Sequence, residues 1–212
     1  MKRLLLELFE DCLSREYREV ENAASYSYGR DPVDGGERLW IFFQHSHGVT
    51  DWMNNLDFSA RPYEEMDPVW NCHAGFLRVW KSVRGYLKPH IFDSNIKSAV
   101  VVGYSHGAAL ATLCHEYIWY HRPDLREHLF GVGFGSPRVL HGCLPPEIAA
   151  RWEQFYVVRN ENDPITHLPP RFTGYCHVGN LITLGDPRAR ADLDSHRPEG
   201  YLAALKALAA QE

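Results

Sequence analysis

Residues 100–111 have the sequence Val-Val-Val-Gly-Tyr-Ser-His-Gly-Ala-Ala-Leu-Ala, in which a G-x-S-x-G motif follows an apolar run and precedes a run of helix-forming residues. This order predicts a buried strand, a sharp turn at Ser105 and a helix from His106. A serine on such a turn has a strained backbone, and the strand and helix pass closely only beside small residues such as Gly103 and Gly107. Ser105 is therefore the predicted nucleophile, at the amino end of a helix.

Short β-like runs alternate with helical stretches along the chain, which is the pattern of an α/β fold. Most of these runs are continuously apolar, as expected for parallel strands covered on both faces. The expected strands are residues 39–43, 98–102, 129–134, 155–158 and 175–184, and the expected helices are an N-terminal segment, 76–87, 106–121 and 198–210. We predict a mostly parallel sheet flanked by helices.

Length and composition restrict the class of protein. The chain has 212 residues, of which 45% are hydrophobic and 23% charged, and this predicts a single packed domain over residues 1–212. The formal net charge of -5 argues against a nucleic-acid partner, which calls for a basic surface. The longest apolar runs are far shorter than the roughly 18 residues that span a bilayer, so no transmembrane segment is expected.

The N-terminal segment begins like a signal peptide, but Glu7, Glu10 and Asp11 interrupt its apolar run, so we predict a helix of the folded protein. One stripe of that helix is expected to face the core, although transient contact with a lipid surface is a second interpretation. The stripe consists of Leu4, Leu5, Leu8, Phe9, Cys12 and Leu13. The five scattered cysteines, Cys12, Cys72, Cys114, Cys143 and Cys176, suggest free thiols and a cytoplasmic location.

A serine nucleophile needs a histidine base and a carboxylate that orients it, and in this fold class they follow the serine in the order acid, then histidine. Asp163 stands where a β-like run passes into a polar turn, and Glu161 is the alternative acid. Among the downstream histidines, His167, His177 and His196 compete. His196 is favoured because it lies in a polar loop before the last helix, whereas His177 lies inside a β-like run and His167 is only four residues from Asp163.

Four ordered motifs together resemble the class 3 lipase family, the fungal-lipase-like α/β-hydrolases. They are the elbow at residues 103–111, Phe-Gly-Ser-Pro-Arg-Val at 134–139, Asn-Asp-Pro-Ile at 162–165 with Leu-Pro-Pro at 168–170, and Ser-His at 195–196 ahead of Tyr201. The resemblance covers residues 39–205 approximately. It implies Ser105, Asp163 and His196 as the catalytic triad of a lipase or esterase.

The resemblance also implies an oxyanion hole formed by Ser46 and by the peptide N–H of His106. The chain departs from the family pattern at both places, because Gln44 and His45 replace Arg and Gly, and His106 replaces a leucine. Where such lipases have a lid, residues 58–72 are short and acidic. We expect a modest flap there, or a plain surface loop.

The expected reaction is hydrolysis of lipid or small-molecule esters through an acyl-enzyme, with no cofactor. The H-x-H of His45 and His47, with His73 nearby, lacks the further ligands of a zinc site, so no metal is expected. Two alternatives stay open. One is a lipase-like binding or signalling protein without activity, and the other is a thioesterase or amidase on the same fold.

Overall fold

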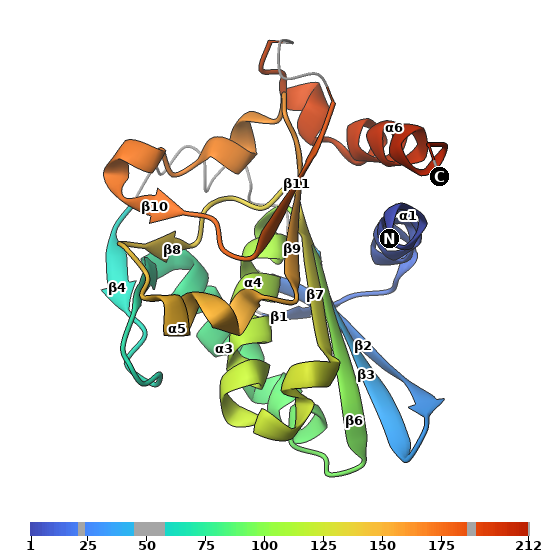
Figure 1. The fold of residues 1–212 in the computed structure, drawn as a ribbon, viewed down its shortest axis with the longest axis vertical. Coiled ribbons are helices and arrows are strands. Elements are labelled where there is room, and N and C mark those ends of the chain that lie inside the picture. Colours follow the sequence, from blue (N-terminus) through green and yellow to red (C-terminus); the bar gives the residue numbers. More distant parts are fainter. Residues whose placement is uncertain (21–23, 45–57, 186–189, 212) are drawn as a thin grey trace.

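A seven-stranded sheet forms the centre of the computed structural model, which describes residues 1–20, 24–44, 58–185 and 190–211. Five neighbouring strands are parallel, and β1 and β2 extend the sheet in antiparallel fashion beside β3 (Figure 1). The strand order is β1 (Arg18–Val20), β2 (Ala24–Val33), β3 (Gly36–Gln44), β6 (Ile96–Tyr104), β7 (Leu129–Phe134), β9 (Phe155–Asn160) and β11 (Asn180–Leu184). The predicted α/β class with a mostly parallel sheet is confirmed.

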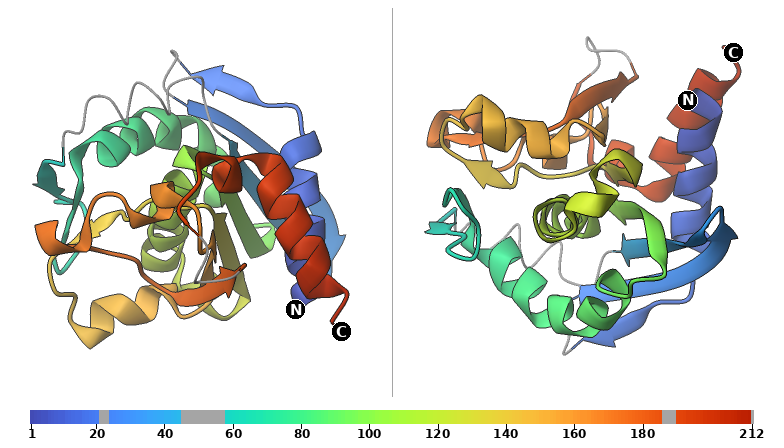
Figure 2. Two further views of the ribbon diagram at one scale, coloured as in Figure 1. Left: turned by 90° about the horizontal axis from the view of Figure 1, so that it is seen from above. Right: turned by 60° about the horizontal axis from the view of Figure 1, so that its bottom comes forward.

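Helices cover both faces of this sheet, and each face has its own apolar core. On one face lie α3 (Ala74–Ile91), α4 (His106–His121) and the short α5 (Pro146–Ala149) (Figures 1 and 2). On the other face α1 (Lys2–Ser14) packs against α6 (Pro198–Ala209), so the two ends of the chain lie side by side. In α1 the predicted stripe buries Leu5, Leu8, Phe9 and Cys12, whereas Leu4 is 40% exposed.

Short 3-10 helices lie in the connections between the strands and helices. They are η1 (Pro123–His128), η2 (Ala150–Trp152), η3 (Pro164–His167), η4 (Arg171–Thr173) and η5 (Leu193–His196). Two residues predicted for the site lie at such helices. Asp163 caps η3, and His196 is the last residue of η5.

A second, antiparallel sheet lies beside the main one and corrects one prediction. Its order is β10 (Tyr175–Cys176), β8 (Leu140–His141), β5 (Asn71–His73) and β4 (Ala60–Pro62). The single strand expected over residues 175–184 is therefore wrong, since it consists of β10 and β11 in different sheets. The chain changes direction at Gly179, whose φ of 76° favours glycine and whose added Cβ would lie 2.3 Å from the Phe155 carbonyl oxygen.

Residues 58–72 form a hairpin and not a plain loop, and the modest flap stays a prediction. The strands β4 and β5 pair across this segment, and between them Tyr63, Met66 and Trp70 are buried in the core. The Trp80 indole donates to the Tyr63 hydroxyl at 2.7 Å, and Arg151 donates to the Asp67 carbonyl at 2.7 Å. The acidic residues that suggested a flap lie on the exposed side of a hairpin that is held by its apolar side chains.

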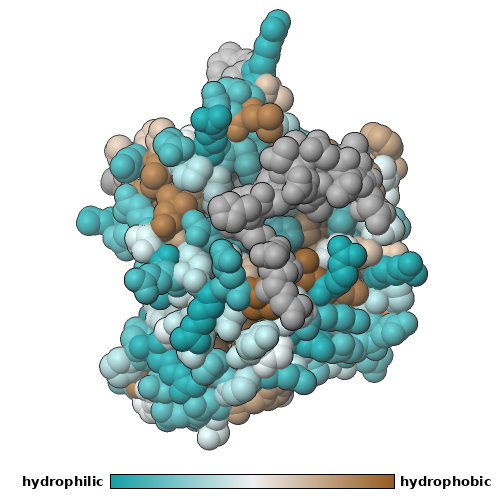
Figure 3. Space-filling model, turned by 180° about the vertical axis from the view of Figure 1, so that it is seen from behind, coloured by the Kyte–Doolittle hydropathy of each residue, from teal (hydrophilic) through white to brown (hydrophobic). Residues whose placement is uncertain are grey.

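The surface is mostly hydrophilic on the face seen from behind, with apolar side chains in small separate groups (Figure 3). In the part of the chain that the structure describes, no helix is long and apolar enough to cross a membrane. The single domain over residues 1–212 stays a prediction.

Candidate functional site

The turn from β6 into α4 is built around a strained serine. Ser105 has φ 57° and ψ -125°, and among the non-glycine residues that the structure describes it alone has a positive φ. Its N–H donates to the Phe134 carbonyl at 2.8 Å. A Cβ on Gly103 would lie 2.3 Å from the Gly107 carbonyl oxygen, and one on Gly107 would lie 2.3 Å from the Phe43 carbonyl oxygen. Only glycine therefore lets strand and helix pass this closely, as the motif predicted.

Ser105, His196 and Asp163 form a continuous line of hydrogen bonds. The Ser105 Oγ lies 2.8 Å from His196 Nε2, and His196 Nδ1 lies 2.7 Å from Asp163 Oδ2. Ser105 and Asp163 are buried, and the His196 side chain is 12% exposed. The structure thus brings together the three residues that the sequence singled out, with a nucleophile–base distance suited to proton transfer.

The Asp163 carboxylate is held by donors on both of its oxygens. Its Oδ1 accepts from the Ile165 N–H at 2.9 Å, and its Oδ2 accepts from the Tyr201 hydroxyl at 2.7 Å as well as from His196. Burial, together with the nearby Asp163 charge, raises the pKa of Tyr201 well above its usual value, so the phenol keeps its proton. The Asn160 N–H in turn donates to the Tyr201 oxygen at 3.0 Å.

His196 is held by Tyr104 and is closely packed against Gly135. The Tyr104 hydroxyl donates to the His196 carbonyl, and the two rings stack with centroids 5.6 Å apart. Gly135 has φ 60°, and a Cβ there would lie 3.3 Å from both Asp163 Oδ2 and His196 Cε1. Sequence analysis assigned no role to Tyr104, Gly135 or Tyr201, although all three stand inside the motifs that it identified.

The alternative acid and bases do not contact Ser105, and two of them have other partners. Glu161 forms an ion pair with Arg159 at 2.9 Å. The Nε2 of His177 lies 2.8 Å from the Thr166 carbonyl oxygen, and burial lowers the pKa of His177 to about 4. His167 lies in η3, where its carbonyl accepts from Arg138. None of these side chains is hydrogen-bonded to Ser105 in the described part of the chain.

The structure describes only one of the two residues that are expected at the oxyanion hole. His106 follows Ser105 at the first position of α4, and its ring contacts Phe76 of α3 with centroids 5.4 Å apart. Ser46 lies outside the described residues, as do His45 and His47. The pairing of Ser46 with His106 therefore stays a prediction.

A metal site has no support among the described residues. Within residues 1–20, 24–44, 58–185 and 190–211, no three His, Cys, Asp or Glu side chains are grouped so that they could hold a metal ion. The His73 side chain accepts from the Gly75 N–H at 3.1 Å at the start of α3. All five cysteines are free thiols.

Comparison with known proteins identifies similar sequences. A family model described as Lipase (class 3) matches residues 40–173. A secreted mono- and diacylglycerol lipase 1 of Fusarium solani is 31% identical over 151 residues, which cover 67% of this chain and 42% of that protein. A lipase of Rhizomucor miehei is 26% identical over 158 residues, which cover 72% of this chain and 43% of that protein. The matched region is thus less than half the length of these relatives.

Solved structures show the same fold. The triacylglyceride lipase of Rhizomucor miehei has a TM-score of 0.67 at 23% identity, covering 81% of this chain and 66% of that one. A mutant form of a Penicillium cyclopium protein has a TM-score of 0.65 at 24% identity, covering 84% of this chain and 65% of that one. These likenesses support the architecture described above.

The predicted cytoplasmic location is wrong according to these relatives. The Fusarium protein and the lipase A of Penicillium camembertii, which is 32% identical over 157 residues, are both described as secreted. The names of these relatives therefore give an extracellular location for them, not a cytoplasmic one. The prediction depended on free cysteines and on an interrupted N-terminal apolar run, and neither feature determines the compartment in which a chain functions.

Proposed function

Because this chain belongs to the class 3 lipase family, we propose that it is a serine hydrolase that cleaves carboxylic esters through an acyl-enzyme on Ser105. The observation that supports this most directly is the hydrogen-bonded line from Ser105 Oγ through His196 to Asp163. The same three groups, in the same roles, activate serine on several unrelated folds.

In the first step Ser105 Oγ attacks the ester carbonyl carbon while His196 Nε2 takes the hydroxyl proton. The buried Asp163 carboxylate, 2.7 Å from His196 Nδ1, stabilises the imidazolium that forms. The tetrahedral intermediate collapses when the bond from carbon to the alcohol oxygen breaks, and His196 donates its proton to the departing alcohol. The products of this step are the alcohol and an ester on Ser105.

In the second step water replaces the alcohol. His196 takes a proton from water, the resulting hydroxide attacks the acyl carbon, and the proton passes to Ser105 Oγ as the carboxylic acid departs. The carbonyl oxygen carries negative charge in both intermediates. The His106 N–H at the start of α4 and the N–H or hydroxyl of Ser46 are the proposed donors to it.

Lipid esters are the proposed substrates. The relatives are named as mono- and diacylglycerol lipases, and this supports acylglycerols or related esters as the substrate class. The reaction needs no cofactor, because the nucleophile, base and acid are all side chains of this chain. Transient contact with a lipid surface is part of the proposal, and a nucleic-acid partner is not, given the net charge of -5.

The test is labelling with a fluorophosphonate, together with hydrolysis of p-nitrophenyl esters of increasing chain length. Ser105→Ala is expected to abolish labelling and to lower turnover on the order of a million-fold, because the nucleophile is lost. Ser136→Ala is the matched control, since Ser136 is equally buried in the next strand-end loop and its hydroxyl donates to the Pro137 carbonyl at 2.9 Å.

The outcome separates the alternatives. A folded protein that neither labels nor turns over any ester is evidence for the non-catalytic binding protein. Labelling at Ser105 with faster cleavage of thioesters or anilides than of esters is evidence for a thioesterase or amidase. Labelling that survives Ser105→Ala contradicts the assignment of the nucleophile.

A further inference from the structure

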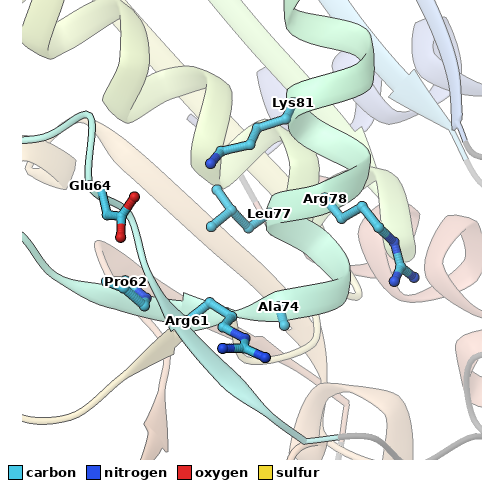
Figure 4. Close-up of a pocket in the computed structure, with 7 residues that line it drawn as sticks. All are labelled: Arg61, Pro62, Glu64, Ala74, Leu77, Arg78 and Lys81. Atoms are coloured by element: carbon cyan, nitrogen blue, oxygen red, sulfur yellow. The ribbon is translucent and has the colours of Figure 1, made fainter.

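Two basic side chains at a cavity between α3 and the hairpin at β4 point in different directions. The cavity has a volume of about 380 Å³, and Lys81 of α3 points toward Glu64 of the hairpin (Figure 4). Arg78 points to the other side of α3, so the two basic groups do not converge on a common ligand (Figure 4). The fold does surround one cationic group with matched partners, and that group is His196, which becomes charged in the proposed reaction.

The ring of Tyr104 lies against one face of the His196 imidazole. The two ring centroids are 5.6 Å apart and the ring planes are inclined by 24°, so the rings are stacked and not edge to face. The nitrogen atoms on the edge of the imidazole have other partners, because Nδ1 bonds to Asp163 and Nε2 bonds to Ser105. Tyr104 therefore contacts the π face of the base, which the hydrogen bonds of the triad do not use.

The position of the Tyr104 ring is fixed from several elements. Its hydroxyl donates to the His196 carbonyl at the end of η5. Phe9 of α1 and Tyr201 of α6 contact the ring edge to face, with centroids 5.4 and 6.0 Å from its own. Tyr104 is only 6% exposed. A ring that is held in this way keeps its place when the imidazole gains a proton, so the contact is in place before the reaction begins.

The Tyr104 phenol is neutral, and this determines how it acts on a cation. Burial, followed by the nearby Asp163 charge, raises the pKa of Tyr104 above its usual value. The face of a neutral aromatic ring carries partial negative charge and attracts a cation that lies within about 6 Å of the centroid. His196 is cationic only after it has taken the proton of Ser105 or of water, so the ring favours the transition states over the resting enzyme.

We propose that Tyr104 stabilises the imidazolium form of His196 through its ring face, in addition to holding the His196 carbonyl with its hydroxyl. Asp163 makes the larger contribution, because its carboxylate lies 2.7 Å from His196 Nδ1 and carries a full charge. Tyr104 acts through His196 and is therefore a positioning residue with an electrostatic part. This inference rests on the proposed hydrolysis through an acyl-enzyme.

Tyr104→Phe, followed by its mono-, di- and trifluorinated forms, tests the ring separately from the hydroxyl. The hydroxyl is absent throughout this series, so what changes is the charge on the ring face. For hydrolysis of p-nitrophenyl esters we expect log kcat to fall with each fluorine, by about three- to tenfold over the series, with little change in KM. The same fluorinated residues in place of Phe42, which is fully buried in the same core, are expected to leave kcat unchanged.

The rate of fluorophosphonate labelling is a second measurement, since it needs the same proton transfer to His196 but no turnover. It is expected to fall in parallel with kcat along the Tyr104 series. Rates that do not follow the number of fluorines, or that fall equally in the Phe42 series, overturn the proposal and leave the proposed function intact. A parent protein that neither labels nor turns over any ester is the distinct result in which the proposed function itself fails.

Discussion

At the scale of single residues, the site depends on one buried carboxylate that accepts three hydrogen bonds. Asp163 receives them from Ile165, Tyr201 and His196, and two of the donors share Oδ2. A carboxylate this far from water needs such partners, since an unpaired buried charge costs several kcal/mol. Tyr201 therefore orients the acid that orients His196, and we regard it as a positioning residue.

Tyr201→Phe is expected to lower kcat of ester hydrolysis about tenfold with little change in KM, because the lost hydrogen bond is to a charged group that does not contact substrate. Steady-state kinetics measure this split. Tyr63→Phe is the control, as it removes an equally buried hydroxyl that bonds to Trp80. Equal losses of kcat in both variants contradict the positioning role.

At the scale of elements, the C-terminal half of α4, away from the Ser105 elbow, has buried polar side chains. Its Glu116 pairs with Arg151 at 2.6 Å and accepts from the Trp70 indole, which ties the helix to the hairpin, and burial raises the pKa of Glu116 to about 7. Its neighbour His115 has no hydrogen-bond partner among the described residues and packs against Phe155. Burial lowers the pKa of His115 to about 3.

The His115 shift predicts a loss of stability in acid. The unfolded chain binds a proton at His115 near the usual histidine pKa of 6.5 and the folded protein only near 3, so stability is lost as the pH falls through this window. His115→Leu is expected to be nearly neutral at pH 8 and, at pH 5, more stable than the parent by about 2 kcal/mol. Urea unfolding of both proteins at both pH values measures this difference in stability. The titration of Glu116 contributes equally to the stability of the two proteins, so it cancels. A difference that is the same at pH 8 and pH 5 contradicts the prediction.

At the scale of the whole molecule, the two ends of the chain pack together behind the site. Phe9 of α1 is fully buried, and its ring contacts Tyr104, Phe134 and Tyr201 at centroid distances of 5.4, 4.8 and 5.8 Å. Two of these partners are the tyrosines that hold His196 and Asp163. The N-terminal helix therefore supports the site although it contributes no atom to it.

Phe9→Ala is expected to lower the free energy of unfolding by about 3–5 kcal/mol, through lost burial and the cavity that is left. Activity well below the unfolding temperature is also expected to fall, because Tyr104 and Tyr201 lose a packing partner. Chemical denaturation and initial rates measure the two effects. Leu4→Ala, on the exposed side of the same helix, is expected to change stability by less than about 0.5 kcal/mol. Comparable effects of the two substitutions contradict a supporting role for α1.

Prediction from sequence succeeded where local signals were strong. The helix at His106–His121 and the strand at Leu129–Phe134 have the predicted bounds. The structure also brings Ser105, His196 and Asp163 within hydrogen-bonding distance, while their catalytic roles stay a prediction. It failed where pairing with a neighbouring strand outweighs the local conformational preferences of the residues. The strand Ala24–Val33 contains Gly29, Asp31 and Pro32, which disfavour strands, yet it pairs with β3 from Ser25 to Val33.

The sequence by itself determined the strained turn at Ser105, because glycine spacing and apolar runs act on the chain locally. It also predicted Asp163 as the acid and His196 as the base, from their order in the chain and their loop positions. Only the tertiary structure decided which side chains hold these groups in place. Tyr104, Gly135 and Tyr201 meet the site from different elements, and the burial that keeps His115 neutral is a property of the packed molecule. Contacts between residues far apart in the chain depend on packing, which local patterns do not encode.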